Sequence, residues 1–293
     1  MLVAPACLLA VAGCGGESPA PSAAVDASAV EAAAAELVTA IKANPPSDNT
    51  TESAVRSFTA AARELSAGAT AAMAAGGKAY DVPTNAMFPE IKGANSTGSR
   101  PAARVFSMKA STPDFGIRRG DVVVFRPTKA ARVACSEPGT VPFIKRVIGM
   151  PGDQVSVRRV TISAGSPYAE LRPGAAGAVQ RTAVPNSFGP DGVDERALAA
   201  GDTTYATFVK SKGQGSAHVS IVDGAVTPDY EVTFPVVPAG QLLVLGDNRP
   251  GSCDAHVWVE RGAAFTPKAR VTHRVLAVYY PASEVHVIKR SGG

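Results

Sequence analysis

Aromatic residues are scarce in this chain of 293 residues, at 6% of positions, and only one of them is a tryptophan. Hydrophobic residues nevertheless make up 45% of the sequence, which excludes a chain that is disordered throughout and predicts at least one sizeable core. The first 78 residues contain a single aromatic side chain, Phe58, and are dominated by alanine, serine and proline. We therefore expect the globular body to lie after them.

The chain also lacks any run of lysine or arginine longer than a pair, although its formal net charge is +4 and its pI is about 8.9. Clustered cations usually mark nucleic-acid-binding segments, so we expect no nucleic-acid partner. A basic surface that favours anionic lipid headgroups fits the scattered charge better. No motif predicts a cofactor, and four dispersed histidines do not predict a metal site: His218, His256, His273 and His286.

Long apolar runs are missing too, because no segment reaches the roughly 20 residues that a membrane-spanning helix needs. Residues 1–13 are apolar and typical of a secretion signal, although no lysine or arginine precedes the apolar run. Val11-Ala12-Gly13-Cys14 resembles the lipobox of bacterial lipoproteins, which implies a lipid on Cys14 followed by a flexible tether over residues 14–26. We expect an exported protein anchored on the extracytoplasmic side of a membrane. The alternative is an ordinary signal peptide with a chance cysteine, which leaves the protein soluble.

Only four cysteines are present, and two of them, Cys7 and Cys14, belong to the signal segment. Cys135 and Cys253 remain as the only pair in an exported chain, where disulfides persist. The sequence therefore predicts a possible disulfide between them. Two separate small hydrophobic side chains are the alternative.

Two helices are predicted ahead of the body. Residues 27–43 are rich in strong helix formers, with one apolar stripe formed by Val30, Leu37 and Ile41. A second helical stretch covers about 51–75 and ends near a pair of glycines. We interpret residues 27–78 as a helical stalk between anchor and body, and packing of the helices against the body is the competing arrangement.

From residue 79 onward, short β-branched runs are separated by glycine and proline, a pattern that favours antiparallel sheets. The predicted strands are Ala103–Ser107, Asp121–Phe125, Phe143–Gly149, Gln154–Ile162, Tyr230–Phe234, Gln241–Leu245 and Val271–Tyr280. We expect a mainly β domain over 79–290, α+β with the helices included. A looser β insertion is expected over 163–229, where glycine, alanine, proline and aspartate dominate.

Three blocks follow one another in a fixed order: RGDVVVF at 119–125, FIKRVIGMPGD at 143–153 and GDNRPGSCD at 246–254. Together they resemble the conserved boxes of the bacterial type I signal peptidases (leader peptidases), which are serine peptidases with a Ser-Lys dyad. The resemblance covers roughly residues 80–283, the insertion excepted, and implies an antiparallel β-sheet catalytic core.

The resemblance assigns roles to residues of the second and third blocks. Lys145 matches the lysine that acts as general base, and its apolar FIKRVIG strand would disfavour the charged ammonium form. Ser252 matches the serine that holds the lysine amine, and Asp254 matches the acidic residue after it. Asp247 and Arg249 match charged residues that brace the loop.

The surroundings of Asp254 depart from the family pattern, because His256 stands two residues later, where the family usually has an arginine. An Asp-Arg ion pair with Asp254 therefore becomes at most an Asp-His contact.

The nucleophile box departs from the family pattern. VPTNAMFPE at 82–90 matches it through Pro83, Met87 and Pro89, and this register puts Ala86 at the position of the nucleophilic serine. A methyl group cannot attack a carbonyl. Thr84 matches the residue whose hydroxyl lines the oxyanion hole, while Glu90 replaces a threonine and is expected to favour a charged Lys145.

Three functions remain open from the sequence. The first is a catalytically impaired homologue that binds extended peptide or preprotein signal segments by β-augmentation. The second is an active endopeptidase that cleaves exported preproteins after small residues with another nucleophile, for which Ser107 and Thr84 are the candidates. The third is a structural surface lipoprotein that keeps the fold as a scaffold.

Overall fold

The computed structural model describes eleven stretches of the chain: 27–88, 90–94, 101–110, 116–137, 139–159, 167–172, 180–182, 220–222, 225–227, 231–247 and 252–288. The predicted signal and tether, with Cys14, lie outside the described residues, as do Arg249 and most of the 163–229 insertion.

The described helices are α1 (Ala27–Ala43), α2 (Thr51–Arg63), α3 (Ala67–Ala74), α4 (Lys129–Ala134) and α6 (Ala255–Trp258). The short 3-10 turns are η1 (Asn85–Met87), η3 (Val259–Arg261), η4 (Lys268–Arg270) and η5 (Ala282–Glu284).

One eight-stranded sheet dominates the fold. Its strand order is β1 (Gly77–Val82), β2 (Ala103–Lys109), β13 (Val271–Tyr280), β3 (Val122–Phe125), β4 (Phe143–Gly149), β11 (Gln241–Leu245) and β12 (Thr266–Pro267), with β14 (His286–Val287) beside β13. A second sheet holds β10 (Glu231–Thr233), β5 (Gln154–Arg159), β6 (Pro167–Arg172) and β7 (Gln180–Thr182), and β8 (Ser220–Val222) pairs with β9 (Ala225–Thr227). Every pairing among these strands is antiparallel, which confirms the predicted mainly β fold.

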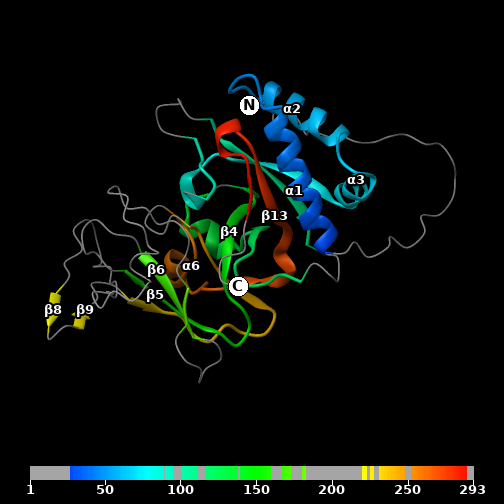
Figure 1. Cartoon of the computed structure of the whole chain (residues 1–293). Coiled ribbons are helices and arrows are strands. Elements are labelled where there is room, and N and C mark those ends of the chain that lie inside the picture. The colour runs from blue at the N-terminus through cyan, green and yellow to red at the C-terminus, as the bar shows by residue number, and fades with distance from the viewer. Residues whose placement is uncertain are drawn as a thin grey trace.

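The N-terminal helices pack on the main sheet. Figure 1 shows α1 running beside β13, and the two elements are in contact. Leu37 and Ile41 are fully buried in a hydrophobic cluster that also contains Phe106 of β2 and Leu276 of β13. Each such buried aliphatic side chain contributes roughly 1.5–3 kcal/mol. Of the two arrangements that the sequence left open for these helices, packing against the body is therefore the one observed.

The second predicted helix is two helices in the structure. Helix α2 ends at Arg63, and α3 starts after Ser66, whose hydroxyl accepts a hydrogen bond from the Ala69 amide. The Ser66 hydroxyl and amide both donate to the Glu36 carboxylate on α1, which fixes the break against the first helix. Serine competes with helix continuation because its side chain can cap a new first turn.

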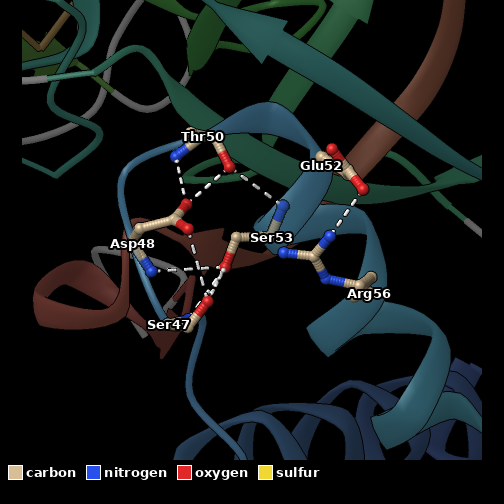
Figure 2. Close-up of polar contacts among 6 residues, drawn as sticks. All are labelled: Ser47, Asp48, Thr50, Glu52, Ser53 and Arg56. Atoms are coloured by element: carbon tan, nitrogen blue, oxygen red, sulfur yellow. Dashed lines mark hydrogen bonds and ion pairs between the residues drawn. The ribbon is translucent and has the colours of Figure 1, made fainter.

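The start of α2 is held by a local polar network (Figure 2). The Thr50 hydroxyl accepts a hydrogen bond from the Ser53 amide and so satisfies one of the open donors of the first turn. The Thr50 amide donates to the Asp48 carboxylate at 2.8 Å. The Thr50 hydroxyl also donates to this carboxylate, at 2.5 Å, and the hydroxyl and amide bonds from Thr50 lower the pKa of Asp48 below its ordinary value. One turn later, Glu52 and Arg56 form an exposed ion pair at 2.6 Å.

The two faces of β2 belong to two different cores. Phe106 and Met108 point into the cluster under the helices, whereas Ala103 and Val105 belong to a cluster with Met87 and Ile91 from the segment after β1. This alternation is the two-residue period of a strand buried on both sides. The segment around η1 is thereby fixed on the face of the sheet opposite the helices.

A disulfide joins α4 to the segment before α6, which confirms the predicted pairing of Cys135 and Cys253. Their Cα atoms are 5.7 Å apart, and the residues are 118 positions apart in the sequence. The Trp258 indole N–H donates to Cys135 Sγ at 3.1 Å, and the Trp258 side chain is fully buried. The disulfide therefore lies beside the largest aromatic residue of its core. One of its cysteines, Cys253, directly follows Ser252 in the sequence.

Replacing Cys135 and Cys253 by alanine is expected to lower the free energy of unfolding by about 2–4 kcal/mol, because the bridge restricts a long loop of the unfolded chain. Denaturant titration of the oxidised protein and of the double variant measures the difference. A reducing agent should destabilise the parent protein by a similar amount and leave the variant unchanged. Equal stability of parent and variant would contradict this expectation.

Candidate functional site

Ala86 lies in the 3-10 turn η1, directly after the end of β1, and is 7% exposed. The turn is fixed by backbone hydrogen bonds from Phe88 to Asn85 and from Ile91 to Met87. Thr84 precedes the turn in extended conformation, is exposed, and makes no side-chain capping bond. The segment that the sequence analysis aligned with a nucleophile box is thus a short, well-held turn with Ala86 in its middle.

Lys145 is carried by β4, which packs against η1. Its side chain is 5% exposed, and its Nζ atom lies 5.7 Å from the centre of the Phe143 ring. Strand β4 is central in the sheet, with β3 on one side and β11 on the other, and Lys145 is opposite Val123 of β3. Lys145 is therefore buried in an apolar strand, and its role as general base stays a prediction.

Gly246 connects the three predicted parts of the site. Strand β11 pairs Leu245 with Arg146, so this register brings Gly246, one residue on, beside Lys145. A Cβ atom on Gly246 would lie 2.1 Å from Ser252 Oγ and 2.4 Å from the Ala86 carbonyl oxygen. No side chain fits there, and the glycine lets Ser252 and Ala86 approach each other across its backbone.

The Ser252 hydroxyl is buried and has no hydrogen-bond partner among the described residues. A buried hydroxyl without a partner destabilises a fold by roughly 1–3 kcal/mol, so the presence of Ser252 at this position points to a functional role. The sequence analysis did not single out Gly246, although a glycine at the end of a buried strand is a signal for close approach of another backbone.

Asp254 holds the loop that carries Ser252. One carboxylate oxygen accepts from the Gly246 amide at 2.7 Å, and the other lies 2.6 Å from His256 Nδ1. The Asp254 side chain is fully buried, and its own helix α6 starts directly after it. The expected Asp-His contact is therefore present, and it adds to the main-chain bond that ties Asp254 to the end of β11.

Asp247 forms a buried ion pair that the sequence analysis did not anticipate. Its carboxylate receives two hydrogen bonds from Arg146, at 2.8 Å from Nε and 2.6 Å from Nη2, and both side chains are fully buried. The remaining Arg146 nitrogen donates to the Gly120 carbonyl at 2.8 Å. Burial opposes the charged form of Arg146, but Asp247 outweighs it and raises the pKa of the guanidinium.

A second charged link connects the body with the helices. Arg274 of β13 pairs with Asp121 at 3.1 Å and with Glu31 of α1 at 2.8 Å. Asp121 also accepts from the Arg118 amide, which holds the turn before β3. No sequence pattern predicts these pairs, because the partners lie up to 243 positions apart.

Glu90 contacts the C-terminal segment. One of its carboxylate oxygens lies 3.3 Å from His286 Nε2, while His286 Nδ1 lies 2.6 Å from the Glu284 carbonyl oxygen. Burial alone would lower the pKa of His286, but the hydrogen bonds to Glu90 and Glu284 raise it above its ordinary value. The predicted influence of Glu90 on Lys145 stays a prediction.

Of the two alternative nucleophiles, Ser107 is buried in β2 and donates its hydroxyl hydrogen to the Lys78 carbonyl at 2.8 Å. Thr84 is exposed and lies two residues from Ala86. Among the described residues, no group of three or more histidine, cysteine or acidic side chains is arranged to hold a metal ion.

Comparison with known proteins shows which family this chain belongs to. The family described as signal peptidase, peptidase S26, matches residues 65–280, which is most of the chain. The protein therefore belongs to the signal peptidase S26 family. The match includes β1, η1, β4 and the loop that carries Ser252.

Individual relatives are distant in sequence. A signal peptidase I of Leptolyngbya laminosa is 24% identical over 204 residues, covering 70% of this chain and 69% of the relative. A probable signal peptidase I-2 of Synechocystis is 26% identical, covering 71% and 65%, and a signal peptidase I of Rickettsia prowazekii is 30% identical, covering 47% and 44%. The chain thus spans about two thirds or less of the length of these relatives. Within the described part, none of the helices has both the length and the hydropathy required for a membrane span.

Proposed function

We propose that this chain is a signal-peptidase-like protein of the extracytoplasmic membrane surface that binds extended peptide segments without cleaving them. The observation that carries the proposal is the assembly of the site around an alanine. Ser252 and Ala86 meet across Gly246, and β4 brings the buried Lys145 to the same place. Covalent serine catalysis needs an oxygen nucleophile at position 86, and a methyl group supplies none.

The remaining groups suit peptide binding. In this proposal Lys145 occupies the general-base position, Ser252 and Asp254 hold its surroundings, and Thr84 with the residue 86 amide forms the oxyanion hole. Backbone N–H donors do not depend on the side chain of residue 86, so the donors that polarise a peptide carbonyl remain. Removing a nucleophile abolishes the chemical step and leaves most of the binding energy in place.

The main sheet offers an edge for an extended peptide. Strand β1 is the last strand of the sheet, and within the described residues only β2 pairs with it. The chain runs from this edge strand directly into Thr84 and Ala86. A peptide that adds to β1 as a further strand would form main-chain hydrogen bonds with it. If the peptide runs parallel to β1, its carboxyl-terminal end reaches Ala86. Such a segment fits the end of a preprotein signal.

A second function is favoured by one observation, the exposed Thr84 two residues before Ala86. In that case the chain is a slow endopeptidase that uses Thr84 as nucleophile and Lys145 as base. Membrane attachment through a lipid on Cys14 belongs to the proposal in either case, and detection of a diacylglycerol-modified Cys14 in membrane fractions by mass spectrometry would test it.

The binding proposal is tested with a fluorescent peptide in which Ala-Leu-Ala is followed by several further residues, so that a bond for cleavage is present. The peptide is titrated with the full chain and followed by anisotropy and mass spectrometry. We expect saturable binding with no hydrolysis. Thr84→Trp should weaken binding about tenfold or more, because a bulky side chain on this exposed position would obstruct the peptide beside Ala86. Thr39→Trp, the same change at an exposed threonine on α1, should leave binding unchanged.

Three results would count against the proposal. Absence of binding would leave the structural lipoprotein as the remaining function. Equal binding by both tryptophan variants would place the peptide elsewhere. Hydrolysis by the natural chain that stops in Lys145→Ala and in Thr84→Val would establish the endopeptidase instead.

A further inference from the structure

A tyrosine-histidine pair lies on the sheet face next to the edge strand. The Tyr80 hydroxyl of β1 is 3.0 Å from His273 Nδ1 of β13, and the two rings meet edge to face with centres 5.3 Å apart. Strand β2 separates the two residues in the sheet, so their side chains reach across it. Both are half-buried and border the same face as Val105 and Met87.

Two lysines flank this pair. Lys78 Nζ lies 4.9 Å from the centre of the Tyr80 ring, and Lys109 of β2 is directly opposite His273 of β13. Burial, Lys78 and Lys109 together lower the pKa of His273 to about 4. The imidazole is therefore neutral at pH 7, and when Tyr80 donates to Nδ1 its own N–H is on Nε2. Two ammonium groups therefore lie near one remaining ring donor, the Nε2–H of His273.

The charge of this area is not balanced by acidic groups. Within the part of the chain that the structure describes, no carboxylate lies within ion-pair distance of Lys78 or Lys109. The opposite face of β1 differs, because Asp81 pairs there with Arg104 at 2.8 Å. One face of the edge strand is thus cationic, whereas on the other face Arg104 neutralises Asp81.

We propose that Lys78, Lys109 and the Tyr80–His273 pair form an anion site that binds an acidic side chain of a peptide paired with β1. The inference rests on the proposed function, since it requires a peptide along this edge. Its physical basis is the pair of ammonium groups on β1 and β2, beside the strand to which such a peptide would add, together with the one remaining imidazole donor. The expected ligand is the carboxylate of an acidic side chain. This side chain lies several residues before the carboxyl-terminal end of the peptide, and it is that end which reaches Ala86.

The geometry also predicts which peptide positions respond. Successive side chains of an added strand point to opposite faces, so a glutamate faces Lys78 and Tyr80 only at every second position. At the intervening positions it would face the Asp81–Arg104 pair, where no net positive charge is present. A stabilising effect should therefore alternate along the peptide with a period of two.

The test uses the full chain and a set of peptides that end in Ala-Leu-Ala. In each peptide one of five upstream positions carries glutamate, and a matched peptide carries glutamine there. At low ionic strength we expect glutamate to improve Kd about threefold to tenfold at alternate positions only, with the gain decreasing as salt is added. The gain should disappear in Lys78→Gln/Lys109→Gln and persist in the control Lys42→Gln, which changes an exposed lysine at the end of α1.

A direct readout comes from NMR titration of His273. Its pKa should rise above about 4 when the glutamate peptide binds, because the added carboxylate offsets the effect of Lys78 and Lys109, and it should not rise with the glutamine peptide.

The two proposals fail in different ways. Binding of glutamate and glutamine peptides with equal Kd at all five positions overturns the anion site and leaves the peptide-binding function intact. Absence of binding by any peptide overturns both. If the lysine pair instead governs binding to vesicles of anionic phospholipid and has no effect on peptide Kd, the site contacts headgroups and the inference is wrong.

Discussion

Under the proposed function, Ala86→Ser is expected to give the chain the ability to cleave the signal segments that it binds. The change adds one hydroxyl oxygen to a turn that already lies against Gly246, with Lys145 on the adjoining strand. Because loss of a nucleophile typically reduces turnover by several orders of magnitude, we expect its restoration to raise cleavage about 1000-fold or more. Cleavage of a purified preprotein, followed by gel and mass spectrometry, measures it.

The matched control removes the base in the same background. Ala86→Ser/Lys145→Met should bind the preprotein and fail to cut it, because the serine hydroxyl then has no group to take its proton. Cleavage that survives the loss of Lys145 would contradict a serine-lysine mechanism. An inactive Ala86→Ser protein that still folds and binds would show that the site has diverged beyond its nucleophile.

Asp247→Asn is expected to reduce the free energy of unfolding by about 3–5 kcal/mol, because it leaves the fully buried Arg146 without its counter-charge. The loss should be visible as a shift of the denaturant midpoint. The double variant Arg146→Met/Asp247→Leu should recover much of the stability, since it removes both charges together.

Glu52→Gln serves as the comparison for Asp247→Asn, because it breaks an ion pair on the exposed surface of α2. Such pairs contribute about 0.5 kcal/mol or less. If Asp247→Asn costs no more than Glu52→Gln, water or other groups already compensate Arg146, and Asp247 does not brace the site loop as the resemblance implies.

The sequence correctly predicted those helices and strands whose local propensity favours the same structure as their tertiary environment. Residues 27–43 form α1 as expected, and 241–245 and 271–280 form β11 and β13. These segments combine a clear apolar pattern with suitable propensities, so local and tertiary preferences coincide. Strand β1 was largely missed because its exposed edge contains glycine, lysine and aspartate, which are uncommon in strands.

The candidate site was predictable only as a set of residue types. Motif order indicated Lys145, Ser252 and Asp254 without any geometry. The pairing of Asp247 with Arg146 could not be inferred, because 101 residues separate the partners and any of several arginines could have reached the carboxylate. Arg249, which the resemblance matches together with Asp247 to charged residues that brace the loop, lies outside the described residues.

The shared core between the helices and the sheet has a consequence for proteolysis of this chain. Helix α1 packs on β13 and contributes Leu37 and Ile41 to the cluster that contains Leu276, so loss of α1 after a cut between α1 and α2 would expose part of this cluster to water. A contiguous apolar surface of this kind promotes aggregation. A cut before Ala27 spares this core, whereas a cut between α1 and α2 is expected to yield a body that aggregates.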